Sequence, residues 1–126
     1  MKVEHIEHLV LTVRDMEMTC SFYHELLGME IEAVSIRRKA LKFGNQQINL
    51  REKRIEFEPE DQLPKPGVID ICFIVAEPIE QVKAELENKN IKIEGVVERS
   101  GPTGKKYSVY FRDPDQHLIE VRNYNN

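Results

Sequence analysis

The sequence has no apolar run long enough to cross a membrane, and its N-terminus, MKVEHIEH, lacks the apolar core of a signal peptide. We therefore expect a cytoplasmic protein without membrane attachment. Cysteine is scarce, and Cys20 and Cys72 stand far apart without the spacing of a metal motif. Because both lie among apolar residues, the sequence predicts buried thiols rather than a disulfide or a metal pair.

The chain also lacks an excess of positive charge, since 18 Lys and Arg stand against 22 Asp and Glu, for a formal net charge of -4. Nucleic-acid-binding proteins need a basic surface to pair with phosphates, so nucleic acid is not the expected partner. The length of 126 residues is that of one domain, which can bury a core without disulfides.

The first half of the sequence predicts one helix and four strands. Asp15 is a suitable N-cap, and Gly28 is a suitable residue to end the helix. Apolar periodicity predicts, in order, a strand at 5–13, a helix at 16–27, and strands at 29–35, 38–43 and 47–52. Residues 54–67 contain several charges and three prolines and are predicted to form a linker.

The second half repeats this order of elements. The pattern predicts a strand at 68–75, a helix at 78–89, and strands at 91–97, 106–112 and 117–122. We therefore predict an α+β fold in which residues 1–126 form a single domain made of two tandem βαβββ modules, 1–53 and 68–126. A helix would cover one face of each mixed sheet, and the other faces would curve around a central cup.

Residues 111–121, FRDPDQHLIEV, combine a tight turn with a strand that carries a carboxylate. Pro114 favours a type I turn, and Asp113 can accept hydrogen bonds that close it. Glu120 follows among apolar residues, where a carboxylate is costly unless a partner, a proton or a metal compensates it.

Polar residues recur at matching places in the two modules. His8 and Asp70 stand near the start of the first strand of each module, and Asn49 and Glu120 stand within the last. These four side chains would either point into the shared cup or lie on unrelated solvent-facing strands. Alternation places Arg51 on the face of Asn49.

Three motifs give the chain a resemblance to the vicinal oxygen chelate superfamily, which has the fold of glyoxalase I. They are HLVLTV (8–13) followed by an Asp, SFYHELLGM (21–29) and YFRDPDQHLIEV (110–121). The chain is most similar to small glyoxalase-domain proteins, some of them virulence-associated, through RKALKFG (38–44) and DICFI (70–74). The superfamily includes isomerases, epimerases, dioxygenases, thiol transferases and metal-free drug-binding proteins, so the resemblance indicates the fold better than the reaction.

The resemblance implies a divalent metal (Mn, Fe, Ni, Co or Zn) and no organic cofactor. The ligand positions are matched here by His8, Asp70 and Glu120, with Asn49 at the fourth. A glyoxalase- or dioxygenase-type enzyme would act on a small oxygen-rich molecule that the metal chelates, and Glu120 would also serve as the catalytic base. The resemblance further implies a homodimer. The cup would either lie within one chain or be completed across subunits, with His8 from one chain and the two carboxylates from the other.

Two residues depart from the pattern of the superfamily. Asn49 is a poor metal ligand, and Arg51 stands where close relatives often have His. We therefore expect Asn49 and Arg51 to contact the substrate, or Arg51 to form an ion pair with Glu120 or Asp70 in place of a metal. The alternative function is a metal-free protein that binds or sequesters a small drug or anion.

Overall fold

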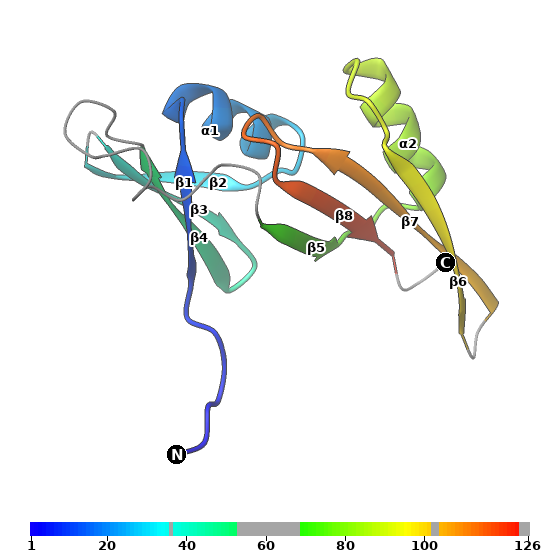
Figure 1. Cartoon of the computed structure of the whole chain (residues 1–126), viewed down its shortest axis with the longest axis horizontal. Coiled ribbons are helices and arrows are strands. Elements are labelled where there is room, and N and C mark those ends of the chain that lie inside the picture. Colours follow the sequence, from blue (N-terminus) through cyan, green and yellow to red (C-terminus); the bar gives the residue numbers. More distant parts are fainter. Residues whose placement is uncertain (36, 53–68, 102–103, 124–126) are drawn as a thin grey trace, which may run out of the picture. The chain divides into compact units, whose positions relative to one another are not determined.

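The computed structural model describes residues 1–35, 37–52, 69–101 and 104–123, and it divides the chain into two units, Met1–Pro66 and Gly67–Asn126. Among these residues each unit has a four-stranded sheet and one helix, which Figure 1 labels. This confirms the α+β fold class with two βαβββ modules. The predicted linker 54–67 lies outside the described residues. Among those described, no helix is long and apolar enough to span a membrane.

The first unit contains β1 (Leu9–Val13), α1 (Met16–Glu25), β2 (Glu30–Ser35), β3 (Arg38–Phe43) and β4 (Gln46–Glu52). Its sheet is mixed, in the order β1-β4-β3-β2, because β1 runs parallel to β4 and the other pairs are antiparallel. The helix contacts β2, β3 and β4, and Asp15 caps it by accepting a hydrogen bond from the amide of Met18 at 3.0 Å.

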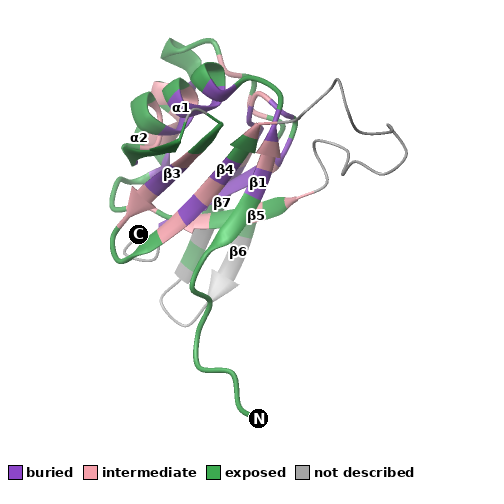
Figure 2. Cartoon of the chain, turned by 90° about the vertical axis from the view of Figure 1, so that its left-hand side faces the viewer, coloured by how far each residue is buried: buried purple, intermediate pink, exposed green. Residues whose placement is uncertain are grey.

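Strand alternation separates the two faces of this sheet. Leu11, Ile48 and Leu50 are at most 2% exposed and belong to the face that α1 covers. Asn49 and Arg51 belong to the open face and are half-buried and exposed, respectively. Figure 2 shows this alternation along β4.

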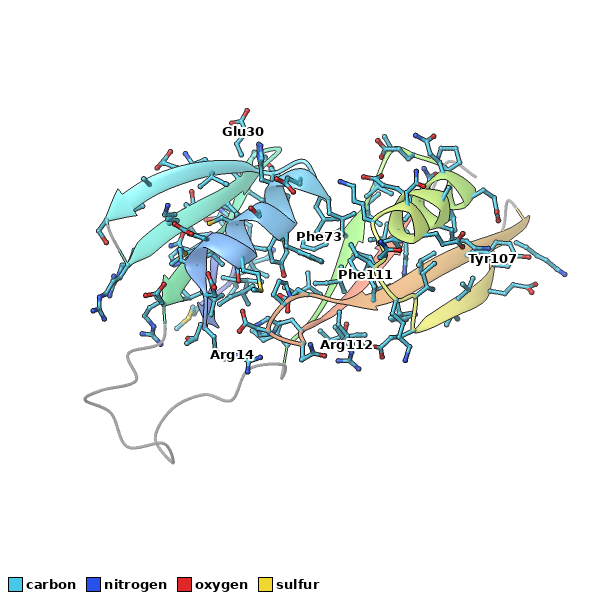
Figure 3. The ribbon with its side chains drawn as sticks, turned by 90° about the horizontal axis from the view of Figure 1, so that it is seen from above. Arg14, Glu30, Phe73, Tyr107, Phe111 and Arg112 are labelled. Atoms are coloured by element: carbon cyan, nitrogen blue, oxygen red, sulfur yellow. The ribbon has the colours of Figure 1, made fainter. Side chains whose placement is uncertain are left out.

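The second unit contains β5 (Asp70–Ile74), α2 (Ile79–Asn88), β6 (Gly95–Gly101), β7 (Gly104–Arg112) and β8 (Leu118–Arg122). Its sheet has the order β5-β8-β7-β6, with β5 parallel to β8, and α2 contacts β7. Val109, Phe111 and Ile119 are at most 1% exposed on the helix side. Figure 3 shows Tyr107 and Arg112 toward opposite ends of β7.

The repeat seen in the sequence is also a repeat of strand register. Val10 on β1 is the partner of Asn49 on β4, and Cys72 on β5 is the partner of Glu120 on β8. The next residues on the open faces are Arg51 in the first unit and Arg122 in the second. Asn49 therefore corresponds to Glu120, and Arg51 corresponds to Arg122.

The predicted starts of two strands were wrong. The first strand begins at Leu9 rather than at residue 5, and residues 1–8 are exposed without regular structure, extending away from the sheet (Figure 1). Leu9 pairs with Ile48, and β4 begins only two residues earlier at Gln46, so little of β4 remains to pair with residues 5–8. The strand predicted at 91–97 begins at Gly95, where pairing with Tyr110 of β7 starts.

The prediction of a buried thiol is correct for Cys20 and wrong for Cys72, which is exposed. Cys20 is buried, which raises the pKa of its thiol, while the charge of Lys39 acts in the opposite direction. Cys72 is exposed because it alternates with Ile71 and Phe73 and so belongs to the open face of β5. Neither cysteine forms a disulfide.

The turn between β7 and β8 is built around the side chain of Asp113, as the sequence predicts. Its Oδ1 accepts hydrogen bonds from the backbone amides of Asp115 and His117, both at 2.9 Å, and Asp113 is only 2% exposed. Gln116 adopts a φ of 71°, a left-handed conformation that glycine adopts more easily. The turn thus tolerates some backbone strain because buried hydrogen bonds hold it.

Candidate functional site

The predicted site residues are divided between the two units. His8, Asn49 and Arg51 belong to the first unit, and Asp70 and Glu120 belong to the second. The site is therefore described one unit at a time. Convergence of all five residues on one cup stays a prediction.

Glu120 is a buried carboxylate on the open face of the second sheet. Glu120 is 6% exposed, and Arg122 Nε donates a hydrogen bond to its Oε2 at 2.6 Å. Ser108 and Tyr110, which face it from β7, also form side-chain hydrogen bonds with it. Burial by itself would raise the pKa of Glu120, but these hydrogen bonds and the Arg122 charge outweigh it and lower the pKa to about 2. Glu120 is thus held ionised.

Arg122 is the residue at this site that the sequence analysis did not identify. Arg51 was considered as a partner for Glu120, but Arg122 holds that carboxylate from two positions further along the same strand. Residues two apart in a strand point to the same face, so alternation could have indicated the pair. Arg51 instead donates a weak hydrogen bond to Thr12 Oγ1 at 3.4 Å.

A hollow of about 240 Å³ lies on the first unit and brings together three predicted site residues, His8, Asn49 and Arg51. Asn49 Oδ1 accepts a hydrogen bond from Gln47 Nε2 at 2.7 Å, and His8 Nδ1 lies 2.9 Å from Glu7 Oε1. The described residues that line the hollow include no acid; they are His8, Val10, Val34, Arg38, Lys39, Asn49, Leu50 and Arg51.

Asp70 is exposed at the start of β5, where its register partner is Leu118 on β8. It lies two residues before Cys72, the partner of Glu120, so alternation places Asp70 and Glu120 on the same open face. The second unit therefore supplies two carboxylates to one face of its sheet.

The donor types of these residues fit a divalent cation, because imidazole and carboxylate groups bind such ions well. Within the described parts of the chain, however, no three or more His, Cys, Asp or Glu side chains are grouped as a metal site. Arg122 also neutralises Glu120, so a cation would have to compete with or displace this guanidinium. The donor set fits a metal, and Arg122 opposes its binding.

Comparison with protein-family models matches residues 5–121 to the Glyoxalase/Bleomycin resistance protein/Dioxygenase superfamily. The chain is 48% identical to Virulence protein STM3117 from Salmonella typhimurium over 98% of this chain and 87% of that protein. The crystal structure of that protein superposes with a TM-score of 0.81, covering 98% of this chain and 99% of the other.

A further relative is similar in sequence, and a structural neighbour is similar in fold. Glyoxalase domain-containing protein RDO1 from Mycosarcoma maydis is 42% identical over 98% of this chain and 70% of its own length. FosX, a fosfomycin resistance protein from Listeria monocytogenes, shares the fold with a TM-score of 0.72 at 21% identity, covering 96% of this chain and 90% of the other. The chain therefore belongs to the Glyoxalase/Bleomycin resistance protein/Dioxygenase superfamily.

Proposed function

We propose that this protein is a metal-dependent enzyme of the glyoxalase or dioxygenase type that acts on a small oxygen-rich molecule. The observation that carries the proposal is the buried carboxylate of Glu120, held ionised on an open sheet face at a ligand position of its superfamily. A carboxylate whose pKa is strongly lowered by a specific charged partner is typical of functional sites. We further propose that the protein is cytoplasmic and forms a homodimer.

His8, Asp70 and Glu120 would hold the cation, which could be Mn, Fe, Ni, Co or Zn. When bound, a divalent cation supplies a Lewis acid that polarises substrate oxygens. A variant of the structural neighbour FosX was crystallised with Mn(II), which makes Mn a reasonable first metal to test. Asn49 and Arg51 would contact the substrate from the first unit.

The low pKa of Glu120 limits its role as a base. A carboxylate whose pKa is about 2 is a good ligand but a weak proton acceptor at neutral pH. To act as a general base, Glu120 would have to lose the hydrogen bond from Arg122, which would raise its pKa. Movement of Arg122, whose side chain is 28% exposed, would thus prepare Glu120 for proton transfer.

Metal content tests the proposal directly. We expect untagged protein dialysed against trace Mn, Fe, Ni, Co and Zn to retain about one ion per chain. His8→Ala and Glu120→Ala should each lose it, since each removes a ligand. His5→Ala is the matched control because it removes an exposed imidazole from the same N-terminal segment. Wild-type protein without metal, or metal retained in both ligand variants, would contradict the proposal.

Mixing two inactive variants tests whether the site is shared between subunits. After exchange, half of the dimers of His8→Ala and Glu120→Ala would contain one chain of each kind. If the site combines His8 of one chain with Glu120 of the other, each mixed dimer regains one of its two sites. Because half of the dimers are mixed, the whole mixture regains about a quarter of the wild-type metal content. A site within one chain would regain none. A monomer in sedimentation equilibrium at micromolar concentration would contradict the dimer.

A second candidate function is metal-free binding of a small drug or anion. The hollow of the first unit favours it, because basic residues line this hollow and, within the described part of the chain, no acidic residue does. The metal measurement separates the two functions, since a binding protein would contain no metal after the same dialysis.

A further inference from the structure

We infer that the open face of the first sheet contains a subsite for a phosphoryl group of a small molecule, held between Arg38 and Arg51. The inference deepens the proposed function, since it names a chemical class for the ligand and rests on that ligand being a small molecule.

Arg38 and Arg51 are direct register partners on the antiparallel strands β3 and β4. Side chains of such a pair point to the same face, with Cβ atoms roughly 4.5 to 5.5 Å apart. Both arginines line the same hollow. Like charges directly opposite each other destabilise a sheet, so the pair costs free energy unless an anion lies between the two guanidinium groups.

No carboxylate among the described residues pairs with either arginine. On the same face of β3, Lys42 Nζ does have an acidic partner, Glu32 Oε2, at 2.8 Å. Glu52 follows Arg51 in the chain but alternates to the other face, where its Oε2 accepts a hydrogen bond from the Met16 amide at 3.4 Å. The positive charge at the hollow is therefore not balanced by the described part of the protein.

The internal repeat strengthens this conclusion. Arg51 corresponds to Arg122 of the second unit, and Arg122 is held by Glu120 at 2.6 Å. In the first unit a neutral residue, Asn49, stands where Glu120 stands in the second. Among the described residues, the same arginine position thus has an internal anion in the second unit and none in the first, as expected if a ligand supplies the anion.

Two arginines favour a dianion over a monoanion. Guanidinium groups bind phosphate oxygens in a bidentate manner, and a phosphoryl group has enough oxygens to accept hydrogen bonds from both. A single carboxylate would neutralise only one of the two charges. The volume of about 240 Å³ is below that of typical drug-sized pockets, so the hollow suits a compact head group.

Isothermal titration with inorganic phosphate at pH 8 tests the subsite in wild-type protein kept in EDTA. We expect saturable binding of phosphate, and at least roughly tenfold weaker binding in both Arg38→Gln and Arg51→Gln, because each removes a charge-assisted bidentate contact. Lys42→Gln is the matched control, since it removes a cation from the same face that Glu32 already neutralises. The two arginine variants should melt at or above the wild-type temperature without phosphate, because each relieves the repulsion between the pair.

Three results would contradict the proposed subsite. They are no saturable phosphate binding, equally strong binding of acetate at matched ionic strength, and a loss of phosphate affinity in Lys42→Gln as large as in the arginine variants. Because EDTA removes divalent metals, the outcome is independent of the metal measurement. Phosphate binding without metal retention would reject only the enzyme proposal, and metal retention without phosphate binding would reject only the subsite.

Discussion

Replacing Glu120 with glutamine is expected to lower the free energy of unfolding by about 2 to 3 kcal/mol at pH 7. The variant loses the ionised carboxylate that accepts the hydrogen bond from Arg122 at 2.6 Å, and with it the negative charge that neutralises this guanidinium. Urea denaturation measures the change. Glu87→Gln on the exposed surface of α2 is the control and should change stability by no more than about 0.5 kcal/mol.

The effect of this substitution should depend on pH in a defined direction. Folding lowers the pKa of Glu120 from 4.5 to about 2, so the carboxylate stabilises the folded protein fully above pH 4.5. This stabilisation is lost as the pH falls from 4.5 toward 2, where Glu120 becomes protonated in both states. The difference in the free energy of unfolding between wild type and Glu120→Gln should therefore shrink over this range. A difference that stays constant would contradict a lowered pKa of Glu120 in the folded protein.

Arg122→Gln provides an independent check on the same ion pair. If the two side chains stabilise the protein mainly through each other, the double variant should be much less destabilised than the sum of the single variants. Additive losses would show that Ser108, Tyr110 and burial, rather than Arg122, hold Glu120 in its ionised form.

Asp113→Ala is expected to lower the free energy of unfolding by about 2 to 4 kcal/mol. The substitution removes the acceptor of two buried hydrogen bonds, from the amides of Asp115 and His117 at 2.9 Å. Those amides would remain buried without a partner, which costs more than the loss of an exposed hydrogen bond. Thermal and urea unfolding both report the loss.

Asp113→Asn separates the hydrogen bonds from the charge. Asparagine keeps a side-chain oxygen at the same position, so we expect it to retain most of the stability that alanine loses. Equal losses in the two variants would mean that the negative charge, rather than the acceptor geometry, stabilises the turn between β7 and β8.

Much of the candidate site could be predicted from alternation within single strands. It placed Asn49 and Arg51 on one face, and the structure places both at the hollow with His8. It did not identify Arg38, because the position of Arg38 opposite Arg51 depends on the register between β3 and β4. Nor was Arg122 identified, because Arg51 was expected as the cationic partner of Glu120, whereas the partner lies on the same strand as Glu120.

The sequence by itself determined the element order, the cap at Asp15 and the turn at Asp113, because these depend on hydrophobic periodicity and on hydrogen bonds between near neighbours. Only the tertiary structure decided where β1 begins, which face exposes Cys72 and which cation holds Glu120. These features depend on which strand supplies the partner and in what register. Pairing between strands is a long-range interaction, so similar local patterns permit several registers, and packing of the whole unit selects one.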